Sequence, residues 1–70
     1  MMPLCFADPE VEYTVKKIGG SPEVKQHLED LGFVVGGRVT VIASLNGNLI
    51  VRVKESRLAI NDEMARKIMI

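Results

Sequence analysis

The first part of the chain changes from a two-residue repeat of hydrophobic positions to a helical one. Val11, Tyr13 and Val15 alternate with polar residues, which is the pattern of a half-buried strand. This strand is expected to end at Ile18, because Gly19-Gly20 form a break directly after it. The pattern therefore predicts a strand followed by a tight turn.

A short amphipathic helix is predicted after this turn. Ser21 and Pro22 are residue types that favour the N-cap and the first helical position. The apolar positions that follow share one face of the helix: Val24, Leu28 and Leu31. Gly32 is placed to end the helix in the left-handed conformation, and Phe33 is expected to fold back onto Leu28.

Two strands joined by a hairpin turn are predicted in the middle of the chain. Period-two alternation begins at Arg38 and is interrupted at Ile42, which indicates either burial on both faces or a strongly bent strand. Asn46-Gly47 is a strong hairpin signal, because both residue types tolerate positive φ. The returning strand is predicted over Leu49–Lys54.

The last part of the chain predicts three short elements. Glu55-Ser56 is expected to be a tight connection into a strand over Arg57–Ile60. Asn61-Asp62 are expected to cap a helical turn over Glu63–Lys67, and Ile68–Ile70 are expected to form a closing strand.

These elements predict a mainly β fold: a small SH3-like barrel of about five strands, with one α-helix inserted after the first strand and a short C-terminal helical turn. Closure of the barrel would remove strand edges that a short sheet cannot otherwise hide. The 70 residues are expected to form a single domain, residues 1–70. Residues 1–10 are expected to be an irregular lead-in, because Pro3 and Pro9 limit regular structure, although Leu4 and Phe6 could dock on the core.

Composition and charge argue against several functional classes. Nine basic residues balance nine acidic ones, whereas a nucleic-acid binder usually carries a basic excess, so no nucleic-acid partner is expected. One cysteine and one histidine cannot form an intramolecular disulfide or a self-contained zinc site. No apolar run is long enough to cross a bilayer and no secretion signal is visible, so a cytoplasmic domain without direct membrane insertion is expected.

The order and spacing of these patterns resemble those of the FeoA domain, the ferrous iron transport protein A family. The residues that carry the resemblance are Ile18-Gly19-Gly20, Val24, Leu28, Leu31-Gly32-Phe33, Gly36, Val39, Val41, Ile50-Val51, Val53, Leu58-Ala59-Ile60, Ala65 and Ile68. The resemblance covers Leu4 to Ile70. Two positions depart from the family pattern: Glu10 stands where glycine is common, and Val35 stands where proline is frequent. The first turn is therefore expected to differ from that of the family.

The resemblance implies an accessory or regulatory role in bacterial ferrous iron uptake. Such domains are expected to act in the cytoplasm by protein–protein contact with the large permease FeoB, which carries a cytosolic G domain. Similar domains also form the C-terminal part of iron- or manganese-dependent repressors, so a metal- or peptide-binding regulatory domain is the alternative. A monomer is expected, because no strand is flat and apolar enough to demand self-association.

Candidate metal ligands are few, and no cofactor is expected apart from weak, transient ferrous iron. His27 is either a partly exposed histidine on the flank of the helix or a ligand assisted by Glu23 or Asp30, each about one turn away. No residues form a catalytic constellation, so the chain is predicted not to be an enzyme.

A partner surface is expected around the turn that follows the helix. Phe33, Val34 and Val35 could supply its apolar centre, and Arg38 could supply part of a charged rim. Consecutive valines are unusual in a turn, because turns favour polar residues. The two valines either form this exposed patch or pack under the barrel.

Overall fold

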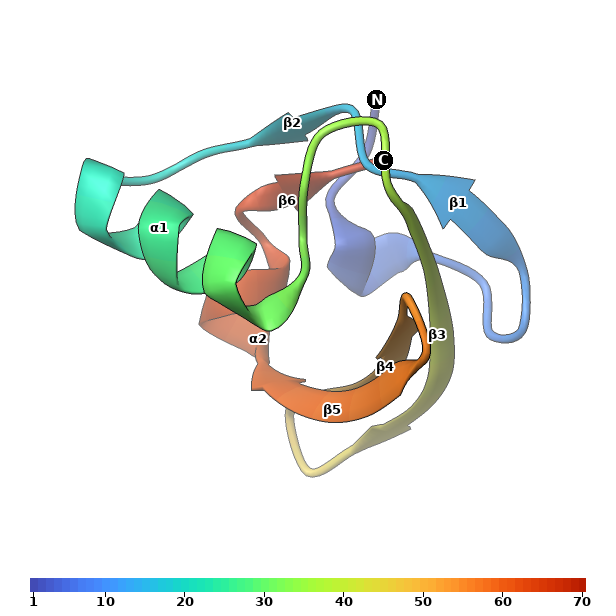
Figure 1. Ribbon diagram of the computed structural model, residues 1–70. Helices are drawn as coiled ribbons and strands as arrows, with labels where there is room; N and C mark the ends of the chain where they lie inside the picture. Colours follow the sequence, from blue (N-terminus) through green and yellow to red (C-terminus); the bar gives the residue numbers. More distant parts are fainter.

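The computed structural model describes all 70 residues and contains two antiparallel sheets with three helical segments (Figure 1). The 3-10 helix η1 (Leu4–Phe6) precedes the strands. The strands are β1 (Glu12–Thr14), β2 (Lys17–Ile18), β3 (Arg38–Leu45), β4 (Asn48–Val53), β5 (Ser56–Asn61) and β6 (Ile68–Met69). The α-helices are α1 (Pro22–Leu31) and α2 (Asp62–Ala65). The predicted mainly β fold, with a helix inserted near its start and a short helix near its end, is confirmed.

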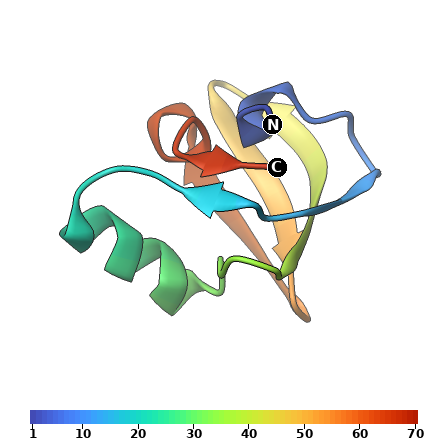
Figure 2. The same ribbon diagram turned by 90° about the horizontal axis from the view of Figure 1, so that it is seen from above.

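The strands form a four-stranded sheet in the order β1-β3-β4-β5 and a two-stranded sheet, β2-β6. Figure 1 shows β3, β4 and β5 curving around one side of the molecule, with β2 and β6 across the interior from β5. Viewed from above in Figure 2, α1 lies to one side of the strands. The two ends of the chain are close together, because the amides of Met2 and Ile70 donate hydrogen bonds to each other's carbonyls at 3.0 and 2.9 Å.

The predicted first strand is divided between the two sheets. β1 pairs with β3, whereas β2 pairs with β6. Between them, the Val15 amide donates to the Gly37 carbonyl at 2.8 Å and the Lys16 amide donates to the Met69 carbonyl at 2.7 Å. The chain therefore changes partners at this point, and the single strand expected to run to Ile18 is in fact two.

Helix α1 follows its predicted start and stop. The Ser21 hydroxyl accepts a hydrogen bond from the Val24 amide at 3.3 Å, and Pro22 is the first helical residue. Gly32 has φ +111°, so the helix ends in the left-handed conformation. The Phe33 amide then donates to the Leu28 carbonyl at 2.9 Å, which closes the reversal that the sequence predicted.

A single cluster of apolar side chains fills the interior, and it contains no polar or charged residue. Strands β3 and β4 contribute alternate residues to it, as their period-two patterns predicted, and helix α1 contributes Leu28. The buried residues are Leu4, Val15, Ile18, Leu28, Phe33, Val39, Val41, Leu49, Val51, Val53, Ile60, Ala65, Ile68 and Ile70.

The β3–β4 hairpin and the end of β5 also follow local signals. Asn46 and Gly47 have φ values of +52° and +80°, the conformation that a two-residue hairpin turn needs. The register of β3 shifts between Val41 and Ala43, so Ile42 marks a bulge and the bent-strand interpretation is correct. Asn61 caps α2 by accepting a hydrogen bond from the Met64 amide at 2.8 Å.

Three predictions near the sheet need correction. The lead-in is irregular only in part, because it contains η1 and an isolated bridge between Pro3 and Met69, and it places Leu4 in the core. Phe6, in contrast, is 70% exposed and does not dock there. The connection before β5 is Lys54-Glu55 rather than Glu55-Ser56, since Ser56 already pairs with Val53.

Candidate partner-binding surface

The turn after helix α1 exposes two valines to solvent. Val34 is 37% exposed and Val35 is 65% exposed, so the patch interpretation is favoured over packing under the barrel. We call the segment Val34–Gly37 the valine turn. Its valines lie between the buried Phe33 and the start of β3, where neither sheet covers them.

Backbone hydrogen bonds fix the valine turn in place. The Gly37 amide donates to the Val34 carbonyl at 2.9 Å, and the Gly36 amide donates to the Val15 carbonyl at 2.8 Å. The Val15 amide donates in return to the Gly37 carbonyl. Gly36 has φ +90°, which an L residue adopts only with strain, and a Cβ on Gly37 would lie only 3.0 Å from the Val34 carbonyl oxygen. The two glycines therefore allow the tight backbone turn that exposes the valines.

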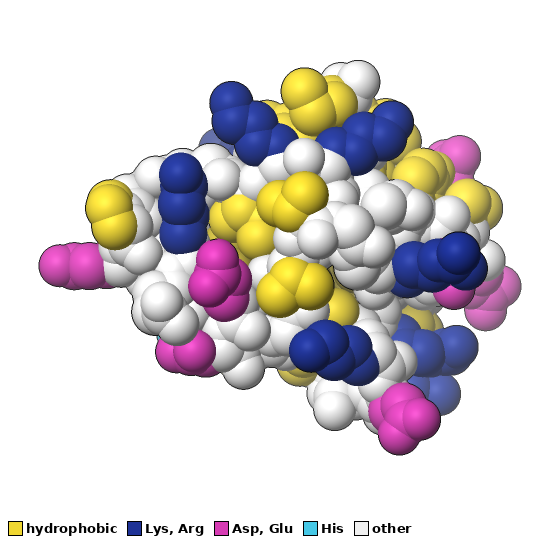
Figure 3. Space-filling model, turned by 45° about the horizontal axis from the view of Figure 1, so that its top comes forward, with side chains coloured by type: hydrophobic (Ala, Val, Ile, Leu, Met, Phe, Trp, Pro, Cys, Tyr) yellow, Lys and Arg dark blue, Asp and Glu magenta, His cyan; other side chains and the backbone are white.

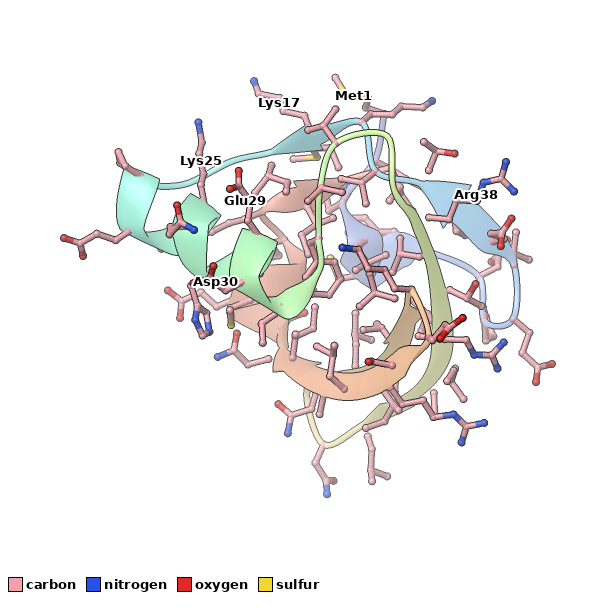
Figure 4. All side chains as sticks on the ribbon, viewed as in Figure 1. Met1, Lys17, Lys25, Glu29, Asp30 and Arg38 are labelled. Carbon is pink, nitrogen blue, oxygen red and sulfur yellow. The ribbon has the colours of Figure 1, made fainter.

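Charged side chains surround this apolar feature. Figure 4 shows Lys17 near the top of the turn, Lys25 and Glu29 along helix α1, and Arg38 on the opposite side. Figure 3 shows the same arrangement, with hydrophobic side chains in the middle of the face and basic and acidic side chains around them. An apolar centre with a charged rim is the usual composition of a protein–protein interface.

Arg38 is placed on this rim by an ion pair across two strands. Its Nη1 lies 2.9 Å from Oε1 of Glu12, and both side chains remain largely exposed, at 73% and 57%. The register partner of Arg38 is Thr14. Glu12 lies two residues before Thr14 on the same face of β1, so the ion pair runs diagonally between β1 and β3. An exposed pair of this kind stabilises the fold only weakly, but it orients the guanidinium.

Phe33 does not belong to this surface, which corrects the prediction that it forms part of the apolar centre. Its side chain is fully buried and is the largest of the completely buried residues. The reason is the helix ending at Gly32, because the reversal that joins the Phe33 amide to the Leu28 carbonyl turns Phe33 toward the interior. The exposed centre therefore consists of Val34 and Val35.

The three candidate metal ligands do not converge. Glu23 and His27 line a groove of about 330 Å³ between α1 and α2, which Val24, Glu63, Met64 and Lys67 complete. Asp30 lies outside that groove, and its Oδ1 accepts a hydrogen bond from Nε2 of Gln26 at 3.0 Å. Nowhere in the structure do three or more His, Cys, Asp or Glu side chains come together as a metal site would require.

Sequence reasoning missed the contribution of β2 to this face. Lys17 lies near the valine turn because Val15, two residues earlier, exchanges hydrogen bonds with Gly36 and Gly37. These contacts join residues far apart in the chain, and no local pattern announces them. None of the helices is long and apolar enough to cross a membrane.

Comparison with known proteins identifies the family of this chain. The model of the FeoA domain matches residues 2–70. The chain is 39% identical over 70 residues to the putative Fe(2+) transport protein A of Methanocaldococcus jannaschii, covering all of this chain and 85% of that protein.

Solved structures agree with the family match. The crystal structure of an iron uptake regulatory protein, FeoA, superposes with a TM-score of 0.88 at 28% identity, covering 96% of this chain and 89% of that one. The zinc complex of FeoA from Stenotrophomonas maltophilia, named as a prokaryotic SH3 domain protein, superposes with a TM-score of 0.84 at 23% identity, covering 99% and 88%. The predicted SH3-like fold is thereby confirmed. The chain belongs to the FeoA domain family.

Proposed function

We propose that this protein is an accessory protein of ferrous iron uptake that acts in the cytoplasm by binding a FeoB-type permease. The valine turn and Arg38 form the contact surface. The observation that carries this proposal is the exposure of Val34 and Val35 on a turn fixed by backbone hydrogen bonds. The assignment to ferrous iron uptake rests on the family, because a relative of this chain is named as a Fe(2+) transport protein A.

A surface that is already ordered suits a binding role. Ordering side chains and loops on association opposes binding, and the valine turn avoids much of that cost because three hydrogen bonds already hold it. Val35 offers an apolar side chain, and Arg38 offers a guanidinium that can pair with a carboxylate at the rim. The cytosolic G domain is the part of the permease that we expect to make this contact.

The structure also favours binding over catalysis. The interior contains no polar or charged residue, so no side chain is held in the low-dielectric setting in which acid–base groups are usually tuned. The ionisable residues lie at exposed or half-buried positions. We therefore infer that the protein changes the behaviour of its partner by contact.

An NMR titration of the labelled protein with the purified G domain tests this proposal. Shifts are expected at Val34–Gly37 and at Arg38. Val35→Asp should weaken binding by about tenfold or more, because it places a charge in the apolar centre. The matched control is Val11→Asp, since Val11 is an exposed valine (44%) outside the valine turn, and binding should be unchanged.

Other outcomes would contradict the proposal. A spectrum that does not change with the G domain would refute contact with that domain. Equal loss of binding in both variants would show that the valine turn is not the contact surface. Shifts at Glu23 and His27 on addition of ferrous iron, without any response to the G domain, would favour the metal-binding regulatory alternative.

A further inference from the structure

A polar cleft lies beside the proposed contact surface and shares Gly37 and Arg38 with it. The cleft has a volume of about 160 Å³ and lies where β1, β3 and β4 meet the end of helix α1. No hydrophobic side chain lines it. Its side chains come from Glu12, Arg38, Thr40, Arg52 and Lys54. We call it the basic cleft, because three of these five side chains are cationic.

The positive charges of the basic cleft are only partly neutralised. Glu12, the cleft's one carboxylate, is paired with Arg38. Arg52 and Lys54 take part in none of the three ion pairs of the molecule. The whole chain has equal numbers of basic and acidic residues, so this local excess is a matter of placement and not of overall composition.

A further arginine extends the cluster across the sheet. Arg57 on β5 lies directly opposite Arg52 on β4, and it too is absent from the ion pairs. Side chains directly opposite one another in an antiparallel pair lie on the same face about 5 Å apart, and like charges there are destabilising. The fold therefore keeps two arginines side by side without a compensating carboxylate.

Protection of a strand edge does not explain this arrangement. Charged residues on edge strands prevent sheets from pairing with one another, and this would account for Arg57 on the edge strand β5. Arg52 lies on β4, which is flanked on both sides by β3 and β5. A charge on this central strand has no edge to protect.

The charge of the cleft matches an extended acidic peptide. Arg52 lies on β4 and Lys54 lies in the turn that follows it, and both line the cleft. Alternate side chains of an extended peptide lie on one side of it about 6.8 Å apart, and their carboxylates pair with arginine through charge-assisted hydrogen bonds. An apolar side chain would find no hydrophobic lining in the cleft.

We propose that the basic cleft binds an extended acidic segment of a partner protein, with alternating carboxylates on Arg52, Lys54 and Arg57. This site goes beyond the proposed function, because the cations that carry it, Arg52, Lys54 and Arg57, belong to β4, β5 and the turn between them. Gly37 and Arg38 border both surfaces. The experiment below therefore changes only Arg52 and Arg57.

A labelled peptide in which glutamate alternates with serine tests the proposal by fluorescence anisotropy at low salt. The matched peptide carries glutamine in place of each glutamate. The glutamate peptide is expected to bind about tenfold more tightly or better, and the difference should shrink as salt rises to about 0.5 M. Arg52→Gln and Arg57→Gln should each weaken binding about fivefold, which corresponds to loss of one ion pair.

Arg66→Gln is the matched control. Arg66 is an exposed arginine at the end of α2 that does not line the cleft, and it pairs with Asp62 at 2.7 Å. Its removal should leave peptide affinity unchanged. Val35→Asp should also leave it unchanged, so failure of this proposal and failure of the permease proposal are separate results.

Several outcomes would overturn the acidic-peptide site. Equal affinity for the glutamate and glutamine peptides would do so, as would equal weakening of peptide binding by Arg66→Gln and Arg52→Gln. Binding of duplex DNA that depends on Arg52 and is tighter than binding of the peptide would also do so. Self-association that Arg52→Gln abolishes, with no peptide binding, would assign the cleft to a second copy of the chain instead. Thermal melts of each variant confirm that the fold is intact before binding is compared.

Discussion

Replacing Phe33 with alanine tests the packing that separates the core from the proposed contact surface. Phe33 is completely buried and is the largest fully buried side chain of the molecule. Burying a side chain of this size contributes about 2–3 kcal/mol of hydrophobic transfer free energy. The space left by its removal adds a cavity term, so the total loss for Phe33→Ala should be about 3–5 kcal/mol.

That loss is a large part of the stability of a chain of this size. A domain of 70 residues is expected to have a free energy of unfolding of about 4–10 kcal/mol, from roughly 0.05–0.15 kcal/mol per residue. Phe33→Ala should therefore lower the melting temperature by at least about 12 °C. Some of the variant protein is expected to be unfolded at physiological temperature.

Urea unfolding followed by far-UV circular dichroism measures the effect, because the chain contains no tryptophan to report on tertiary structure. Val35→Ala is the control. It lies two positions along the chain but is 65% exposed, and it should change the free energy of unfolding by less than about 0.5 kcal/mol. A loss below about 1 kcal/mol for Phe33→Ala, or equal losses for the two variants, would refute the assignment of Phe33 to the core and of Val35 to the surface.

Three further substitutions test backbone strain and charge placement, each by thermal and urea unfolding. Gly32→Ala should lower the free energy of unfolding by about 1–2 kcal/mol through backbone strain at φ +111°, because an added Cβ would meet its nearest atom at an ordinary 3.5 Å. Gly19→Ala is the control: it has no positive φ and a nearest atom at 3.6 Å, so it should cost less than about 0.5 kcal/mol. Equal costs for the two variants would refute the strain argument. Glu10→Gly should stabilise the protein by about 0.5 kcal/mol, because Glu10 has φ +63° and glycine relieves that strain at some cost in chain entropy; a loss of stability would contradict this. Arg57→Glu should also stabilise the protein by about 0.5 kcal/mol by placing a carboxylate opposite Arg52, and should abolish binding of the acidic peptide; lower stability would show that the arginine pair is not a source of repulsion.

The parts of the fold that the sequence predicted well are those encoded within a few residues. The helix start at Ser21 and its stop at Gly32 depend on local capping and on one left-handed residue. The hairpin at Asn46-Gly47 depends on two residue types that accept positive φ. Glu10 is an informative exception, because it adopts a positive φ that its residue type does not announce.

The parts that failed depend on partners distant in the chain. Nothing between Val11 and Ile18 shows that the strand changes sheets, since the change is made by hydrogen bonds from Val15 to the valine turn and from Lys16 to Met69. The burial of Leu4 likewise requires β6 to lie beside the N-terminal segment. Phe33, Val34 and Val35 are three consecutive apolar residues, and only the backbone reversal at Gly32 assigns the first to the core and the others to the surface.

The basic cleft shows how strongly a functional surface depends on register. A connection at Glu55-Ser56 would place Lys54 opposite Arg57 and leave Arg52 opposite Ala59. The observed connection at Lys54-Glu55, in which Lys54 takes a positive φ of 56°, moves the pairing by one position along β4 and β5 and brings Arg52 opposite Arg57. A slip of one residue in a turn therefore decides whether the arginines form a cluster, and the sequence around Lys54 contains no glycine or asparagine that would mark the left-handed position. The proposed binding of an acidic segment therefore depends on the register, because only the observed pairing of β4 with β5 brings Arg52 opposite Arg57.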